Sequence, residues 1–366
     1  MTRPTSQAGL TLVELMIALT LGLIVIGALV AVFVANSRNY RQNDALSSVQ
    51  DNARYALDVM GRDLAMAGYW GGVRPQDATS NLRLSAIAAA AVSNSALPGD
   101  CGPSSPPSGT AWLFDVSQPI GFRDHQASGA VTDLFRCLTN VAANTDIVMI
   151  RRAAGVMALN LPLGSANDLR LLTAGRFYLK TNASIGTLFR ADASNTSPAL
   201  PADCPDASGT NAPCPPTSAP MQLYAYTPHL YYVRNYRRTV GDGETTLCRR
   251  FLNDTLATPI MDEECLADGV ENLQIEWGLD TSVSNPNNTT PYSYVRAPTA
   301  DQMDSLATAR IYLLVRAPIK NVGLSPDAKS YNFAGYNSAN DPAFPQTGYV
   351  RRLFSTTVQL KGLRPQ

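Results

Sequence analysis

An unbroken apolar run near the N-terminus constrains this chain more than any other feature. The residues from Gly9 to Glu14 read GLTLVE, and apolar residues then continue to Val34. A segment of roughly 18 or more apolar residues is long enough to cross a bilayer as a helix. A carboxylate in such a helix costs about 2.5–3.5 kcal/mol, so an acidic residue there indicates a function. Glu14 is therefore the first candidate functional residue.

The spacing of Gly9 and Glu14 resembles the class III signal of type IV pilins and type II secretion pseudopilins. The resemblance implies that residues 1–9 are a leader and that a prepilin peptidase cuts after Gly9. Leu10 would then be the first mature residue and would be N-methylated. Two positions depart from the usual pattern: Leu10 stands where major pilins usually have Phe, and Arg3 is the only basic residue of the leader.

Two other interpretations of the apolar run fit less well. A secretory signal peptide has an apolar core of about 7–15 residues and an A-x-A-like cleavage site. Here the core is longer, it contains Glu14, and the residues 33–35 (FVA) make a poor site. A plain membrane anchor fits the length but leaves Glu14 unexplained.

The amphipathic pattern continues beyond the apolar run. Apolar residues recur at helical spacing, at Leu46, Val49, Ala53, Leu57, Met60 and Leu64. The opposite face is predicted to carry Asp44, Asp51, Arg54, Asp58, Arg62 and Asp63, with Asp58 and Arg62 spaced for an ion pair. No Pro occurs from Leu10 to Ala67, and Gly68 is a natural stop.

The sequence therefore predicts one long helix with two parts. Residues 10–35 would be the transmembrane and assembly half, and residues 36–68 the amphipathic half. Gly22 and Gly27 are its weak points.

The composition of the chain predicts that the part after the helix, residues 69–366, forms one β-rich body. The 366 residues include 29 basic and 29 acidic ones, so no basic excess indicates a nucleic-acid partner. Only 16% of residues are charged, and Gly and Pro number 25 each, which favours strands and loops over a helical bundle. Strand-like patterns occupy residues 146–150, 176–180, 230–236, 246–251, 272–280, 310–316 and 354–361, with a hairpin signal at 241–244. Residues 97–109 and 192–220 are expected to form loops.

Six cysteines, an even number, suit an exported protein in an oxidising compartment. Of the fifteen possible connectivities, pairing nearest neighbours gives Cys101–Cys137, Cys204–Cys214 and Cys248–Cys265. The predicted fold class is α+β: a pilin-like long N-terminal helix packed on an antiparallel body with disulfide-stapled loops.

Four blocks look like the PilW family of type IV pilus minor pilins: residues 53–57 (ARYAL), 66–71 (MAGYWG), 269–275 (GVENLQI) and 351–358 (RRLFSTTV). Residues 94–220 match no family pattern and are interpreted as an insertion within the body.

Catalytic and metal-binding patterns are missing. His125 and His229 lie at no metal-ligand spacing, and no nucleotide or hydrolase motif occurs. Residues 242–244 and 280–288 offer oxygen ligands of the type calcium prefers, but without EF-hand spacing solvated turns are favoured. We therefore expect no enzyme activity, no metal and no cofactor.

The resemblance implies a minor pilin that joins other minor pilins in a priming complex. Before assembly its helix would lie in the inner membrane and its body in the periplasm. After assembly it would be located at the pilus tip, beneath a tip adhesin. Prepilin peptidase and the major pilin would be further partners. Glu14 would pair with the N-terminal amine of an adjacent subunit. Two alternatives remain: a type II secretion minor pseudopilin, and a membrane-anchored adhesin or ligand-binding module.

Overall fold

The structure is a computed structural model of the full chain. It describes residues 9, 11–73, 82–84, 101–102, 112–126, 134–161, 172–182, 185–191, 203–205, 211–213, 221–254, 259–280, 292–317, 329–341, 344 and 348–363.

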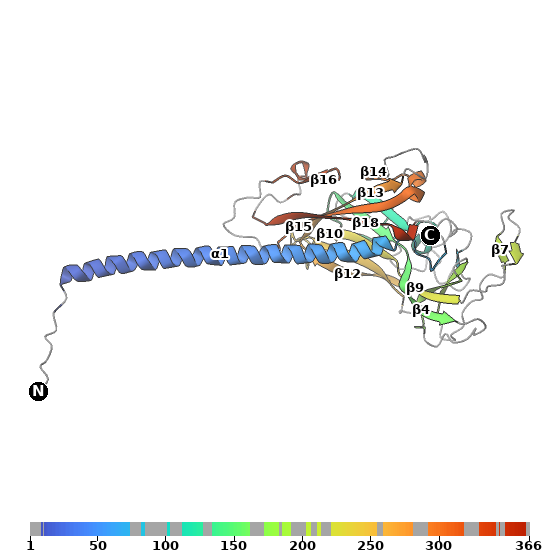
Figure 1. Ribbon diagram of the computed structural model, residues 1–366, viewed down its shortest axis with the longest axis horizontal. Coiled ribbons are helices and arrows are strands. Elements are labelled where there is room, and N and C mark those ends of the chain that lie inside the picture. The colour runs from blue at the N-terminus through green and yellow to red at the C-terminus, as the bar shows by residue number, and fades with distance from the viewer. Residues whose placement is uncertain are drawn as a thin grey trace, which may run out of the picture.

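A single long helix and a β-rich body make up the fold (Figure 1). The helix α1 runs without interruption over Leu12–Ala65, so it starts two residues and ends three residues inside the predicted range 10–68, and Gly22 and Gly27 do not break it. At its end, Gly68 adopts a φ of +73° and donates its N–H to the carbonyl of Arg151 at 3.0 Å. This left-handed glycine turns the chain from the helix into the body.

Three sheets form the body. The central sheet has the order β12-β11-β10-β3-β2, with bounds Ile260–Asp268, Thr246–Asn253, His229–Arg234, Thr145–Ile150 and Ile120–Gln126. The C-terminal sheet has the order β14-β13-β15-β18, with bounds Tyr292–Val295, Val270–Asp280, Leu306–Arg316 and Arg351–Gln359. The distal sheet has the order β1-β6-β5-β9-β4, with bounds Leu82–Leu84, Gly186–Arg190, Phe177–Thr181, Met221–Tyr226 and Ala153–Leu161.

Small elements complete the described part of the chain. Two ribbons pair β7 (Asp203–Pro205) with β8 (Asn211–Pro213) and β16 (Asn332–Phe333) with β17 (Tyr336–Asn337). The short 3-10 helices are Trp112–Phe114, Ala300–Ser305, Ser338–Asn340 and Lys361–Leu363. Strand pairing is antiparallel except between β1 and β6, which are parallel.

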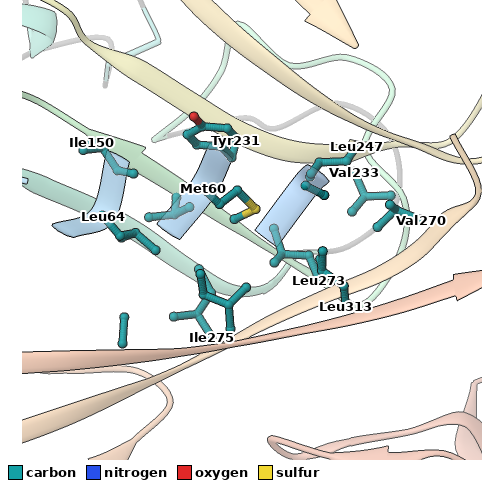
Figure 2. Packing of buried hydrophobic residues seen from close by; sticks show 14 of the residues in the cluster. Met60, Leu64, Ile150, Tyr231, Val233, Leu247, Val270, Leu273, Ile275 and Leu313 are labelled. Atoms are coloured by element: carbon teal, nitrogen blue, oxygen red, sulfur yellow. The ribbon is translucent and has the colours of Figure 1, made fainter. Parts of the chain in front are cut away.

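The second half of α1 lies in the main core, between the central and C-terminal sheets. Figure 2 shows Met60 and Leu64 surrounded by side chains of both sheets, among them Tyr231 of β10 and Ile275 of β13. These residues are fully buried, and burying each large apolar side chain contributes about 1.5–3 kcal/mol. The predicted stripe is confirmed in its C-terminal part, where Val49, Ala53, Met60 and Leu64 are all buried; Ala56 joins them, while Leu46 and Leu57 are only partly covered.

Each strand predicted from periodicity lies within or next to an observed strand, and the 241–244 turn joins the antiparallel pair β10 and β11. Apolar and polar residues alternate in 272–280, which predicts an exposed polar face for β13, and this expectation is wrong for two of the polar residues. Asn272 and Gln274 are buried and donate their side-chain amides to the carbonyl of Asn144, which lies just before β3.

The range 94–220, which the sequence predicts to be an insertion within the body, supplies strands to two of its sheets. Its strands β2 and β3 belong to the central sheet, and β4, β5 and β6 belong to the distal sheet. The ribbon β7–β8 also lies where only loops were expected, whereas most of residues 97–109 fall outside the described residues. This part of the chain therefore contributes strands to the central sheet, one of the two sheets between which α1 lies.

Two of the three expected disulfides are present in the described residues: Cys101–Cys137 and Cys248–Cys265. The second one bridges the adjacent strands β11 and β12. Cys214 and the side chain of Cys204 lie outside the described residues, so their predicted pairing stays a prediction.

Candidate functional site

The first half of α1 stands clear of the body (Figure 1). Its large apolar side chains from Leu12 to Val34 are all exposed, with Leu12 at 75% and Leu23 at 76%. Among the described residues, α1 is the one helix long and apolar enough to cross a membrane by length and composition. Water is a poor environment for such a surface, so it needs lipid or other helices around it.

Thr11 and Glu14 close the start of the helix. The Glu14 Oε2 atom accepts hydrogen bonds from the Thr11 backbone N–H and the Thr11 hydroxyl, both at 3.0 Å, and the Glu14 N–H donates to the Thr11 Oγ1 at 3.3 Å. This reciprocal capping box satisfies two backbone donors that a helix start leaves free. It fixes the Glu14 carboxylate at the very tip of the apolar half.

Glu14 is the only charged residue between Leu12 and Val34, and the next charges along the chain are Arg38 and Arg41. Its carboxylate is therefore isolated on an otherwise apolar surface. Gly9 is exposed, and a Cβ built there would meet no atom within 4 Å, so nothing in the described fold requires glycine at this position. Leu10 lies outside the described residues.

A buried polar cluster joins the other end of α1 to the body. Asp63 is 4% exposed, and both oxygens of its carboxylate are engaged. Oδ1 accepts from Arg152 Nη2 at 2.5 Å, and Oδ2 accepts from His229 Nδ1 at 2.5 Å and from the Tyr231 hydroxyl. Since an ionised carboxylate only accepts hydrogen bonds, the proton of this His229 contact lies on Nδ1.

The cluster corrects one prediction, because Asp63 does not lie on the solvent face of the helix. His229, for which the sequence predicted no metal-binding role, is a hydrogen-bond partner of this carboxylate. The signal that could have revealed Asp63 is its spacing: it follows Met60 by three residues and Ala56 by seven, so it extends the buried stripe. The predicted Asp58–Arg62 pair is confirmed, with Nη2 and Oδ2 2.7 Å apart, and it is exposed.

The surroundings of Asp63 favour its charged form. Burial alone would raise the pKa of this carboxyl, but the hydrogen bond and charge of His229, the guanidinium of Arg152 and the Tyr231 hydroxyl together hold the pKa well below its usual range. For the same reasons, burial and the Asp63 charge raise the pKa of Tyr231. Asp63 is therefore an ionised carboxylate whose charge is balanced by the Arg152 guanidinium, between α1 and the central sheet.

Two of the blocks that suggested PilW meet in a second buried cluster. Glu271 is the extra residue of a β-bulge in β13, and its two oxygens bind Arg351 of β18 at 2.6 and 3.1 Å. Arg316 of β15 lies 3.5 Å from the same carboxylate, and all three side chains are buried. A Cβ at Gly269, whose φ is +78°, would lie 2.3 Å from the Arg316 carbonyl oxygen, so the turn before this bulge requires glycine.

The acidic loops give no sign of a cation site within the described residues. The Asp242 carboxylate accepts hydrogen bonds from the backbone N–H groups of Arg237, Arg238, Thr239 and Glu244. Its slight burial raises the pKa, but these four bonds outweigh that effect and lower the pKa to about 2. A cluster of Cys248, Cys265 and Glu263 has suitable spacing for a metal, but its sulfurs are already joined in a disulfide. Residues 281–291 lie outside the described part of the chain.

Comparison with known proteins gives two family matches. Residues 230–362 match the PilW family model, described as Type IV Pilus-assembly protein W, and residues 4–30 match the prokaryotic N-terminal methylation motif. Among solved structures, a type IV-like pilin from Thermus thermophilus is similar to this chain, with 12% identity over 62% of this chain and 83% of that chain and a TM-score of 0.25. No curated protein matches the chain. The PilW match contains the Glu271–Arg351 cluster, and the methylation motif contains Gly9, Thr11 and Glu14.

Proposed function

We propose that this chain is a PilW-type minor pilin, a non-catalytic subunit that joins other minor pilins to initiate assembly of a type IV pilus. One observation carries the proposal above the others. An unbroken helix leaves its whole apolar half exposed, begins with one isolated carboxylate, and ends locked into a disulfide-bonded body.

The exposed half of α1 suits two environments in turn. The residues from Leu12 to Val34 span about 34 Å at 1.5 Å per residue, which matches the roughly 30 Å hydrocarbon core of a bilayer. Before assembly this segment would anchor the subunit in the inner membrane with its body in the periplasm. In the pilus, the same side chains would pack against helices of neighbouring subunits instead of lipid.

Glu14 would act as a register device. Once residues 1–9 are removed, the new N-terminal amine lies on Leu10, and the amine of an adjacent subunit can approach the Glu14 carboxylate. Bringing such a pair into an apolar core adds little net stability, because desolvation opposes the attraction. An unpaired carboxylate in the same core is strongly unfavourable, so the pair selects the one axial offset that satisfies it.

Gly9 would serve the processing enzyme. The fold leaves open space around this position, so any need for a small residue comes from the peptidase that binds it. Methylation of the Leu10 amine would keep its positive charge.

A location at the pilus tip, among other minor pilins and beneath a tip adhesin, follows from the resemblance to PilW alone. The shape of the protein supports this placement in one respect. The distal sheet lies at the end of the molecule opposite the helix N-terminus (Figure 1), where a tip subunit has room for further partners.

The intact mass of the chain from cells with and without prepilin peptidase tests the proposal first. We expect a mature chain that begins at Leu10 and carries one methyl group, and an uncut chain in the peptidase mutant. A chain that keeps Met1 in both strains, or one cut after Ala35, would refute the proposal that this protein is a pilin. A deletion strain then separates the two export systems: loss of pili supports this proposal, whereas intact pili with a secretion defect would indicate a pseudopilin.

A further inference from the structure

The edge of the C-terminal sheet next to α1 is open. β18 is the last strand of that sheet and pairs with β15 on one side only. At the two ends of this pairing, Ala317 donates its N–H to the Val350 carbonyl and Leu360 donates its N–H to the Ala307 carbonyl. Hydrogen-bonded pairs alternate along an antiparallel ladder. The even-numbered residues of β18 therefore bond to β15, and the odd-numbered residues direct their N–H and C=O groups to the free edge.

Over most of the strand, no described residue occupies these outward backbone groups. Tyr331 donates its hydroxyl to the Arg351 carbonyl at 3.4 Å, at the beginning of β18. Within the described residues, no hydrogen bond to the backbone edge of Leu353, Ser355, Thr357 or Gln359 is present. All four residues are exposed, with Leu353 at 38%. The open edge extends for about 20 Å, at about 3.4 Å per residue.

The side chains of this edge do not protect it from pairing. Edge strands are usually shielded by charges, prolines, bulges or a very short length. β18 pairs with β15 without a register shift, and residues 353–359 contain no charge and no proline. Other long edges are protected: β12 carries Asp262, Glu263 and Glu264, and the pairing of β4 shifts register twice.

The open edge lies beside α1, the helix that would pack against neighbouring subunits during assembly. A Cβ at Gly61 would lie 3.3 Å from Val358, and one at Gly68 would lie 2.7 Å from Leu363, so β18 and α1 run side by side in the same direction. A subunit that packs its own helix along α1 brings its body to this edge. Antiparallel pairing of β18 with its counterpart in a second copy would reverse one of the two helices, which is incompatible with insertion of both into one membrane in the same orientation.

We propose that the free edge of β18, residues 353–359, is a strand-addition site for an extended segment of a different pilin subunit. The partner segment is a neutral strand whose backbone completes the hydrogen bonds of Leu353, Ser355, Thr357 and Gln359. Small polar or β-branched side chains suit it best, because they pair well with Ser and Thr across strands. This inference rests on the proposed function, since it takes the neighbour to be a pilin.

Photo-crosslinking of the full chain in its own cells tests the proposal. p-Benzoyl-phenylalanine is introduced at Gln359, and mass spectrometry identifies the protein and the peptide joined to it. The variant Thr357→Pro removes one outward N–H without touching the ladder to β15, and proline is tolerated at such edge positions. Thr357→Ala is the matched control, because it shortens the side chain and keeps the backbone donor.

We expect an adduct with an extended segment of another protein that carries a prepilin signal. Thr357→Pro should reduce this adduct about fivefold or more, and Thr357→Ala should leave it within about twofold. An adduct only with a second copy of this chain, an adduct with no pilin-type protein, or an equal adduct in Thr357→Pro would overturn the proposal.

Two controls keep the outcome decisive. Protease resistance and cellular amount show whether Thr357→Pro folds; if it does not, Thr357→Lys retains every backbone group and should reduce the adduct, because a lysine on an edge strand disfavours further pairing, so an unchanged adduct would overturn the proposal. The sheared pilus fraction is assayed in parallel. A wild-type chain found in pili without any Gln359 adduct defeats the strand-addition site alone, whereas its absence from pili defeats the proposed function as well.

Discussion

Replacing Asp63 by Ala tests whether the buried cluster locks α1 to the body. The variant removes the carboxylate and leaves the Arg152 guanidinium and the His229 ring without their shared acceptor. Removing one partner of a buried, hydrogen-bonded ion pair costs about 3–5 kcal/mol, because the remaining charge stays desolvated. Asp63 satisfies the conditions for the full effect, since its side chain is 6% exposed and that of Arg152 is 16% exposed.

The expected loss converts into a temperature shift. A body of roughly 300 residues unfolds with an entropy of about 0.6 kcal/mol/K near its midpoint. A loss of about 3–5 kcal/mol therefore lowers the unfolding midpoint by about 5–8 °C. The measurement is thermal unfolding of the detergent-solubilised full chain, followed by near-ultraviolet circular dichroism without reductant.

The same helix supplies a matched control. Asp58 pairs with Arg62 on the exposed face, where the side chains are 52% and 79% exposed. An exposed helical pair of this kind contributes about 0.3–0.5 kcal/mol, so Asp58→Ala should lower the midpoint by less than about 1 °C. Equal midpoints for the two variants, or an unchanged midpoint for Asp63→Ala, would refute the argument.

Acid provides an independent check of the same cluster. The folded-state pKa of Asp63 lies below its unfolded value of about 3.9. A carboxyl whose pKa is depressed on folding stabilises the protein above the unfolded pKa, and this contribution is lost as the pH falls through the folded pKa. The difference in midpoint between wild type and Asp63→Ala should therefore be constant above about pH 5 and shrink below about pH 4.

Three further predictions concern the start of the helix and a disulfide bond. Gly9→Leu should block removal of the leader, which an immunoblot detects as an uncut chain; normal processing would contradict the role assigned to Gly9. Glu14→Ala should reduce recovery of the chain in sheared pili while leaving protease resistance of the body unchanged, and wild-type recovery would exclude a register role. Replacing both Cys101 and Cys137 by Ser should destabilise the body by about 4 kcal/mol, because this bridge closes a 36-residue separation, and calorimetry should show no such loss if the bridge does not form.

The periodicity of apolar residues was sufficient to predict a helix or strand wherever one face of the element is buried and the other is exposed to solvent. The stripe through Val49, Ala53, Met60 and Leu64 predicts α1, and the alternation in residues 354–361 predicts β18. The alternation in β13 gave the strand but the wrong environment for Asn272 and Gln274. Which neighbour covers a polar face depends on tertiary packing, and the spacing within one strand carries no information about it.

Polar residues on buried faces were the main source of error for the same reason. Asp63 lies at helical spacing within the apolar stripe, but a charged residue is nearly always assigned to solvent unless its partners are known. Those partners, Arg152, His229 and Tyr231, are far away in sequence and come from two other segments. The Glu271–Arg351 pair was hidden similarly, although both residues belong to blocks that the sequence had already singled out.

The position of the buried cluster gives it a mechanical role in assembly. The last fully buried stripe residue toward the membrane is Val49, so the helix from Leu12 to Val49 extends for about 55 Å from its nearest anchor. A tilt of about 5° at that anchor moves the helix start sideways by about 5 Å, which is more than the roughly 3 Å of a hydrogen bond. A displacement of this size would carry Glu14 out of reach of a neighbour's amine. A rigid junction between α1 and the two sheets is therefore as necessary for this pairing as the carboxylate itself. Asp63→Ala is accordingly expected to lower recovery in pili at temperatures where the body is still folded, even though its signal and Glu14 are intact.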